Sequence, residues 1–327
     1  MTTTTTVRAR GSTMQWARFL LIRLVRAVVV MVVLVVVTFA MVRLVPGDPA
    51  QRILGMNADP VALAATRERL GLDAAWLTQF ADYVNGVLTF DFGTSFQTGE
   101  TVSKIIADRV WPTLQAALLA IVLVAVGGLL VGLWAGVVTE RRRPVTEATF
   151  SGITGVIGIL PPYLLGTLLV WLFAVQLQWL PVAGSGSLAK AILPAMALGL
   201  APMAMLARVV RVETLTVLGQ DYMRLARSKH LPGIRLFTDH LLPNVLGPVL
   251  PILGALSATL IGGSVVIERV FARPGLGEEL AQGVQVGDFP VVQGLVIFLG
   301  GVVVLTSFIA DVLAAIIDPR VRRAVVR

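Results

Sequence analysis

The sequence predicts an all-α protein that crosses a membrane six times and carries a small extracytoplasmic subdomain between the first two spans. Apolar residues make up 56% of the 327 residues and charged residues 14%, against about 45–50% and about 25% in soluble domains. Six segments stay apolar over the roughly 20 residues that a helix needs to cross a hydrocarbon core. Basic residues gather at every second connection between these segments, which is typical of a polytopic membrane chain.

The expected spans follow from the length of each apolar run. They lie at residues 19–44, 112–138, 151–177, 189–210, 244–267 and 289–317. The segments outside them are an N-terminal tail at 1–18, the subdomain at 45–111, a polar loop at 211–243 and a C-terminal tail at 319–327.

The first span begins as a signal peptide does, with Arg18, Arg23 and Arg26 ahead of a run rich in Val, Met and Leu. It is longer than a signal peptide, and residues 43–48 (RLVPGD) follow it in place of a small-residue cleavage site. We therefore expect a retained signal anchor. The subdomain that follows contains a stretch at 76–88 with helical spacing, so we expect it to be partly helical.

The orientation follows from the basic connections. The tail at 1–18, the connection between the second and third spans, the loop at 211–243 and the C-terminal tail are rich in Arg, whereas the connection between the third and fourth spans holds only Lys190. Between the fifth and sixth spans, acidic residues outnumber basic ones. Because basic connections stay in the cytoplasm, both termini are expected to be cytoplasmic.

The loop at 211–243 contains a short polar helix. Asp221 is suited to cap its N-terminus, and Pro232-Gly233 stops it. Tyr222, Ala226 and Lys229 then share one face with Leu225, because residues three or four apart are neighbours on a helix. This face suits docking into a groove of another protein, or contact with anionic lipid, and the residues alone leave both open.

Residues 219–229 (GQDYMRLARSK), with His240 and Asn244 downstream, resemble the coupling motif of dipeptide/oligopeptide importer permeases of the DppB/OppB family, the inner-membrane components of binding-protein-dependent transport systems. The resemblance covers nearly the whole chain after about residue 17. Further matching segments occur in the family's order at 46–49 (PGDP), 91–95 (DFGTS), 112–114 (PTL), 177–181 (LQWLP), 274–277 (PGLG), 289–294 (FPVVQG) and 318–320 (DPR).

The resemblance implies a type I ABC importer permease fold, with a permease core at 112–318, in a bacterial cytoplasmic (inner) membrane. It implies four kinds of partner besides membrane lipid: a second homologous permease, one or two ABC ATPase subunits, an extracytoplasmic substrate-binding protein and a peptide substrate. ATP and Mg²⁺ would bind to the ATPases, and no cofactor to this chain. The implied ATPase-coupling residues lie in the helix at 221–231: Asp221, Tyr222, Arg224, Leu225, Ala226, Arg227, Lys229 and His230.

The chain departs from the family pattern at two positions of this motif. His230 stands where the family usually has Gly, so the helix is expected to end differently. Gln220 stands at the usual acidic position, and the carboxylate is at Asp221 instead. The family also transports longer peptides, nickel chelates, haem and glutathione, and no residue of this chain distinguishes among them.

Four residues outside the loop are candidates for the translocation path or for contact with the binding protein. Pro161 and Pro162 interrupt the third span. The break either lets the helix line the translocation path or serves only the packing of membrane helices. Asp311 is an acid within a span, for which an ion pair with Arg320 or a partner subunit is favoured over substrate contact. Glu268 lies at the outer mouth, where it is a candidate for contact with a peptide amine or the binding protein, although a structural role is favoured.

Several other functions are excluded by what the sequence lacks. No Lys follows a Gly, so a GxxxxGK[ST] phosphate loop is absent and the chain is not expected to be an enzyme. Cysteine is absent, and the two histidines, His230 and His240, form no recognisable metal site. The basic residues flank apolar spans rather than one groove, which argues against nucleic acid. A secondary transporter or channel without ATPase partners is the alternative, but the spans offer few titratable groups besides Asp311.

Overall fold

The computed structural model of the chain describes residues 4–44, 49–55, 58–69, 73–140, 143–182 and 184–317. Helices make up most of this part, and its one strand-like pairing is an isolated bridge between Thr94 and Thr101. The segments at 46–48 and 318–320, which carry two of the motifs above, lie outside the described residues.

Five stretches of helix are long and apolar enough to cross a membrane, at Met14–Val42, Val102–Thr139, Ala189–Leu218, Gly233–Val270 and Phe289–Ile316. A sixth forms if Pro144–Ile159 and Pro162–Gln176, which meet at a bend of 105°, count as one span. The all-α polytopic fold that the sequence predicts is therefore confirmed within the described residues.

Several helices extend beyond the expected spans. The first helix is α1 (Thr4–Leu44). The second span combines α5 (Val102–Val122), a π-helical turn (η1, Leu123–Gly127) and α6 (Gly128–Thr139). The fourth is α9 (Ala189–Leu218), and the fifth combines α11 (Gly233–Arg235), η3 (Leu236–Leu241) and α12 (Leu242–Val270). The sixth, α14 (Phe289–Ile317), covers the same residues as the expected span.

The second span starts ten residues before its apolar run because its first turns are amphipathic. Val102, Ile105 and Ile106 are buried against Leu276 and the start of α14. Pro112 lies inside the helix without ending it, and its carbonyl oxygen accepts a hydrogen bond from Arg273. The buried contact on one face thus extends the helix at its N-terminal side, through the charged residues that precede residue 112.

The third expected span, at 151–177, is not one straight helix. It consists of α7 (Pro144–Ile159), α8 (Pro162–Leu169) and a π-helical segment (η2, Val170–Gln176). Leu160 has extended backbone, Pro161 is the N-cap residue of α8 and Pro162 its first residue. A proline suits the first helical position but clashes with a helix continuing from before it, so the pair ends one helix and begins another.

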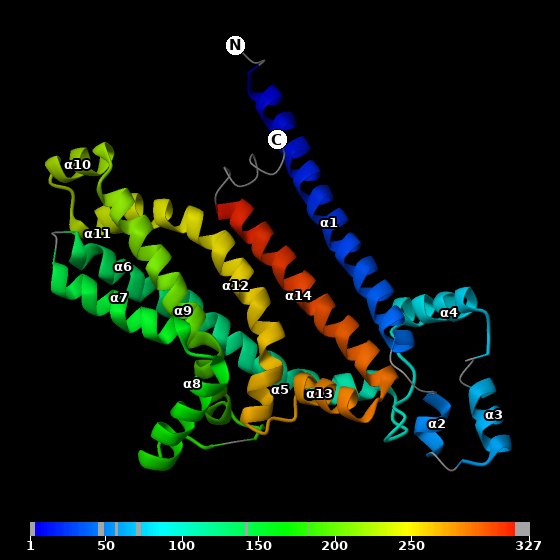
Figure 1. Cartoon of the computed structure of the whole chain (residues 1–327). Coiled ribbons are helices and arrows are strands. Elements are labelled where there is room, and N and C mark those ends of the chain that lie inside the picture. The colour runs from blue at the N-terminus through cyan, green and yellow to red at the C-terminus, as the bar shows by residue number, and fades with distance from the viewer. Residues whose placement is uncertain are drawn as a thin grey trace.

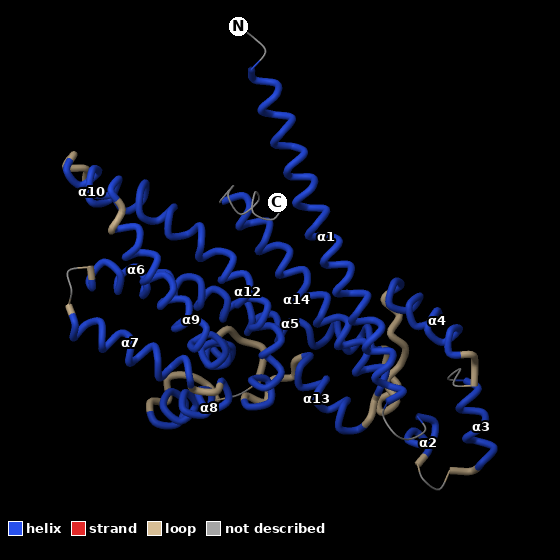
Figure 2. Tube along the Cα trace, turned by 45° about the horizontal axis from the view of Figure 1, so that its top comes forward, coloured by secondary structure: helices blue, strands red, loops and turns tan. Residues whose placement is uncertain are grey.

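The central helix is α9, which packs against α5, α6, α7, α8 and α12 (Figure 1). Next to it α12 contacts α14, and α14 contacts α1, which lies at the edge of the molecule (Figures 1 and 2). The largest cluster of buried apolar side chains is built mainly from α9 and α12, and α5, α6, α8 and α10 add to it. On α1 most Val side chains are exposed, as expected for a helix that faces lipid.

The segment between the first two spans holds α2 (Pro49–Leu54), α3 (Pro60–Arg69) and α4 (Trp76–Thr89). A hydrogen bond of 2.8 Å between the hydroxyls of Thr38 and Tyr83 ties α4 to α1. Another helix, α13 (Leu276–Val286), connects α12 to α14. Figure 1 shows α2, α3 and α13 toward one side of the molecule, and α10 with the start of α1 and the end of α14 toward the other.

Candidate functional site

The expected polar helix is α10 (Asp221–Ser228), which follows α9 after Gly219 and Gln220. Gln220 is its N-cap residue, and the Gln220 carbonyl accepts hydrogen bonds from the backbone N–H groups of Met223 and Arg224. Asp221 is the first helical residue, not the cap, and its negative charge suits the positive end of the helix.

One face of α10 is anchored to the rest of the chain. Met223 is fully buried in the main core cluster, and Ala226 is only 6% exposed. Ala226 was expected on the exposed face beside Tyr222 and Lys229, but the structure turns it inward with Met223, one turn away. The apolar pair at positions 223 and 226 is the sequence signal for this anchor.

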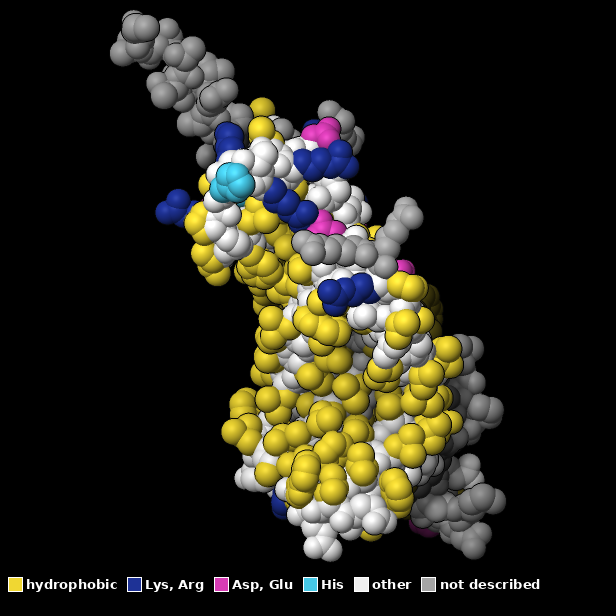
Figure 3. Space-filling model, turned by 90° about the vertical axis from the view of Figure 1, so that its left-hand side faces the viewer, with side chains coloured by type: hydrophobic (Ala, Val, Ile, Leu, Met, Phe, Trp, Pro, Cys, Tyr) yellow, Lys and Arg dark blue, Asp and Glu magenta, His cyan; other side chains and the backbone are white. Residues whose placement is uncertain are grey.

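The opposite face of α10 is exposed. Tyr222 and Leu225 are 42% and 57% exposed, although both are large and apolar. Arg224 and Lys229 are exposed beside them, and Arg224 has only a distant partner, Asp221, at 3.6 Å. The face formed by Tyr222, Arg224, Leu225 and Lys229 is called the docking face below. Figure 3 shows Lys and Arg side chains gathered at this end of the molecule, above a broad apolar surface.

Arg227 points back to its own chain. Its guanidinium donates two hydrogen bonds to the carboxylate of Glu140, at 2.7 and 3.1 Å. Such paired hydrogen bonds fix direction as well as distance. Since Glu140 follows directly on α6, this contact joins α10 to the cytoplasm-facing end expected for the second span.

A second arginine holds the neighbouring helices together. Arg211 of α9 forms an ion pair with Glu147 of α7 at 2.8 Å and donates a hydrogen bond to the hydroxyl of Thr139 at 3.1 Å. Its guanidinium also lies 5.8 Å from the ring centre of Phe150. The ends of α6, α7 and α9 are thus fixed to one side chain beneath α10.

α10 ends at Ser228, three residues before the expected end at 231, and His230 lies just beyond it. His230 adopts a φ of 52°, in the left-handed region that glycine occupies without a steric cost. Its backbone N–H donates to the carbonyl of Arg227. The imidazole is exposed, and within the described residues no group of three His, Asp or Glu side chains is arranged to hold a metal ion.

Glu268 is not at a surface. It is 1% exposed, and its Oε2 accepts hydrogen bonds from the backbone N–H groups of Gly277 and Glu278 at 2.8 and 3.1 Å. It therefore caps α13 from the end of α12, and the expected contact with a peptide amine or a binding protein does not fit its burial. A Cβ added at Gly275 would come within 2.4 Å of this carboxyl group, which is why glycine is needed there.

Arg273 completes the same buried turn. Its guanidinium donates to the carbonyl oxygens of Gly184, Lys190 and Pro112 and to Gln115. Burial lowers the pKa of Arg273, and the charge of Glu268 acts in the opposite direction. An arginine remains charged despite such a shift. The pair thus connects α5, α9, α12 and α13 at the side opposite α10.

Asp311 lies between α14 and α1, away from the central α9. Its carboxylate forms an ion pair with Arg23 at 2.6 Å. The sequence suggested Arg320 or a partner subunit, and Arg320 lies outside the described residues. A helix pair formed by the first and last spans could not be read from local sequence, so Arg23 was missed.

Pro161 and Pro162 are exposed at the bend between α7 and α8. Pro162 begins α8, which packs against α9 and α12. The residues that sequence reasoning missed at the α10 site are Met223, Glu140, Glu147 and Arg211. Besides the apolar pair at 223 and 226, the charge complementarity of Glu140 with the basic loop was the available signal.

Comparison with known families gives two matches. The family described as "Binding-protein-dependent transport system inner membrane component" matches residues 128–323. The family of the corresponding N-terminal segment matches residues 16–117.

Similar proteins cover nearly the whole chain. The glutathione transport system permease protein GsiC of Salmonella typhimurium is 37% identical over 304 residues, which is 93% of this chain and 98% of that protein. A putative peptide transport system permease protein of Brucella abortus (strain 2308) is 39% identical, over 93% of this chain and 98% of that protein. A chain from inward-facing structures of the MetNI methionine ABC transporter aligns with a TM-score of 0.52 at 22% identity, covering 65% of this chain and 96% of that one.

Proposed function

Because this chain belongs to the family of binding-protein-dependent transport system inner membrane components, we propose that α10 is the element through which it binds cytoplasmic ATPase subunits. The chain is the membrane-spanning permease subunit of an ABC importer and not itself an enzyme. The alternative of a secondary transporter or channel acting alone is not favoured by this membership.

The observation that carries the proposal is the division of α10 into two faces. Met223 and Arg227 fix the helix to the permease, while Tyr222 and Leu225 stay exposed beside two cations. Exposed aromatic and arginine side chains near the centre of a patch are the groups that most often dominate binding between proteins. A helix that is anchored on one face and exposed on the other can pass the movement of a bound partner to the permease.

The coupling route runs through residues of this chain. Movement of α10 acts on α6 through the Arg227–Glu140 pair and on the core through Met223. Arg211 then connects α6 with α7 and α9. Arg227 is accordingly a positioning residue, and the docking face consists of Tyr222, Arg224, Leu225 and Lys229.

The assembly and orientation complete the proposal. The chain lies in a bacterial inner membrane, and α10 and both termini face the cytoplasm. One or two ATPase subunits on that side bind ATP and Mg²⁺. A second homologous permease forms the other half of the path, and an extracytoplasmic binding protein delivers the substrate. The names of the relatives support a small peptide, with glutathione included in that class.

Charge reversal on the docking face tests the proposal. In reconstituted vesicles that contain the whole transporter, Tyr222→Asp or Arg224→Glu should leave membrane insertion unchanged and remove most ATP-driven uptake of labelled dipeptide or glutathione. The matched control is Arg235→Glu, an exposed residue of α11 outside the docking face, which should transport normally. Wild-type uptake by both docking-face variants would refute the role of α10. Uptake of neither substrate by the wild-type transporter would refute only the substrate class.

A further inference from the structure

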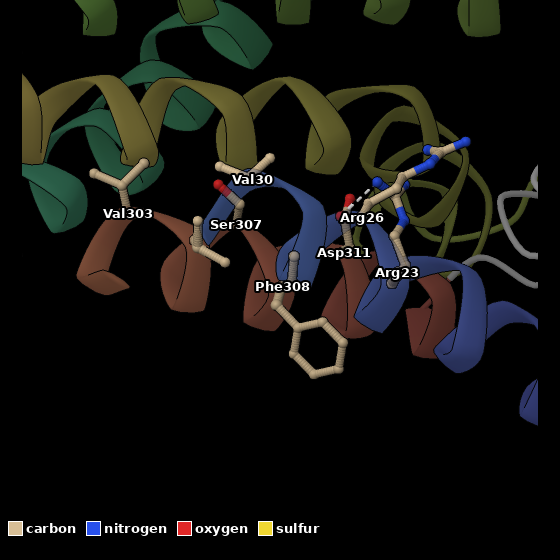
Figure 4. A pocket seen from close by; sticks show the side chains of 9 residues that line it. Arg23, Arg26, Val30, Val303, Ser307, Phe308 and Asp311 are labelled. Atoms are coloured by element: carbon tan, nitrogen blue, oxygen red, sulfur yellow. Dashed lines mark ion pairs between the residues drawn. The ribbon is translucent and has the colours of Figure 1, made fainter. Parts of the chain in front are cut away.

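A cavity of about 230 Å³ lies between α1 and α14, apart from the docking face. Arg23, Arg26 and Val30 line it from α1, and Val303, Ser307 and Asp311 are among its lining residues from α14. In Figure 4 the two arginines and Asp311 gather at one end of the cavity, and the valines lie toward the other. The cavity therefore has a charged end and an apolar end.

The charged end has a net positive charge. Among the described residues that line this end, two guanidinium groups face one carboxylate, which leaves one positive charge uncompensated. Arg23 pairs with Asp311 at 2.6 Å, yet its Nε is buried without a hydrogen-bond partner. Arg26 is exposed and forms no ion pair with any described residue. This end thus offers free N–H donors to an anion.

The depth of the charged end matches a membrane interface. Arg23 lies 19 residues before Val42, the end of the apolar stretch of α1, which is about 29 Å along a helix. Asp311 lies 22 residues after Phe289, the start of α14, which is about 33 Å. Since the hydrocarbon core is about 30 Å thick, both groups lie at the boundary opposite the subdomain.

We propose that this cavity binds one anionic phospholipid of the cytoplasmic leaflet, with its phosphate against Arg23 and Arg26 and an acyl chain along Val30, Val303 and Val304. The leaflet follows from the proposed orientation, but the site is independent of how α10 acts. Basic pockets between transmembrane helices on the cytoplasmic side recognise such headgroups. The apolar end favours a lipid over a free phosphate, because only a lipid also covers the valines.

The lipid would add to the contact through which α1 joins the rest of the chain. α1 packs against α14 and only lightly against α4, and many of its side chains face outward. A phosphate that contacts arginines of α1, with a chain lying along α14, connects the two helices without a new protein contact. The first span is thereby joined to the rest of the permease by a lipid as well as by the Arg23–Asp311 pair.

Lipid binding to the purified whole transporter tests the proposal, with native mass spectrometry as the readout and phosphatidylglycerol as the probe. Arg26→Gln should weaken binding of the tightest phosphatidylglycerol by about fivefold, the effect of one cation near an anionic headgroup. The matched control is Arg18→Gln, the same change on the same helix outside the cavity, which should have less than a twofold effect. Val30→Phe should also weaken binding, because the ring fills the apolar end while both arginines remain.

Further arms separate the possible outcomes. Asp311→Asn frees Arg23 and should tighten phosphatidylglycerol binding several-fold, whereas a carboxylate with a purely structural role would give no gain. Equal losses for Arg18→Gln and Arg26→Gln would indicate a diffuse basic surface and overturn the proposal. Equal affinity for phosphatidylcholine, or displacement of the lipid by inorganic phosphate, would overturn it as well.

Discussion

At the scale of single residues, the α10 site depends on which way each cation points. Arg224 and Arg227 are three positions apart, yet only Arg227 reaches a carboxylate on another helix. The first is free for a partner, and the second is occupied by Glu140. The two arginines of one motif therefore have different roles, and their charge-reversal variants should behave differently.

Charge exchange should reveal this difference. Arg227→Glu should weaken ATP-coupled uptake because two carboxylates then face each other, and the added change Glu140→Arg should restore much of it. Both side chains are partly exposed, so the pair itself contributes only about 0.5–1 kcal/mol to the free energy of unfolding. Uptake and melting temperature of the two single variants and the double variant measure both effects. Arg224→Glu is the control, and rescue of that variant by Glu140→Arg would contradict the assignment.

His230 offers a prediction about stability. Its φ of 52° carries a steric cost of roughly 1 kcal/mol for a residue with a Cβ, which glycine avoids. His230→Gly should therefore raise the melting temperature of the purified transporter. His240→Gly, within the helical η3 segment, should lower it because glycine costs about 1 kcal/mol there. Equal shifts of both variants would show that the α10 terminus is not strained.

At the scale of helices, the most extensive packing lies between α6 and α9. Gly128, Gly132 and Gly136 form a ridge without side chains on α6. A Cβ at Gly132 would lie 2.6 Å from the carbonyl oxygen of Ala207 and 2.5 Å from Cβ of Val210. Neither atom belongs to a flexible side-chain end. Close approach of backbones at small residues is a common source of helix association in membranes.

Adding one methyl group at this ridge should separate the helices. Gly132→Ala is expected to lower the free energy of unfolding by about 1–3 kcal/mol, the range for overpacking in a tight core. Gly152→Ala on α7 is the matched control, because a Cβ there meets nothing within 4 Å and Ala favours a helix. Thermal denaturation in detergent compares the two. A melting temperature for Gly132→Ala as high as that of the control would show that α6 and α9 pack less closely than described.

The sequence predicted the helices whose apolar runs are long enough to require burial or lipid. α14 shows this, since its 29 residues are apolar almost throughout. It missed α13, which is too short to be a span and whose start is capped by Glu268 of α12. The prolines at 161 and 162 indicated a break, but not its angle of 105°. Angles and long-range caps depend on tertiary contacts that no local pattern contains.

The candidate site shows the same limit. The motif at 219–229 located α10 and its exposed aromatic residue, because these are local properties. It placed Ala226 on the wrong side, since which face is buried depends on the η3 segment and on α9 packing beneath α10. The Glu140 partner of Arg227 lies 87 residues away in the chain and could not be paired from spacing alone.

At the scale of the whole molecule, the two ends carry different structural features. The end with α10 carries the anchored helix and the two ion pairs beneath it. The other end carries α2, α3, α4 and the buried turn of Glu268 and Arg273 (Figure 1). α9 runs from one end to the other and packs against α5, α6, α7, α8 and α12. Under the proposed role, a displacement of α10 would act on the far end through α9.

This division requires that the two ends face opposite sides of the membrane. The chain has no cysteine, so a single introduced thiol reports its own side. In intact cells, Thr78→Cys on α4 should react with a membrane-impermeant maleimide, while Ser228→Cys on α10 should react only after the membrane is opened. Both side chains are exposed, so burial does not explain a missing reaction. Labelling of Ser228→Cys in intact cells would place α10 outside the cytoplasm, where it could not contact a cytoplasmic ATPase. That result would refute the coupling role.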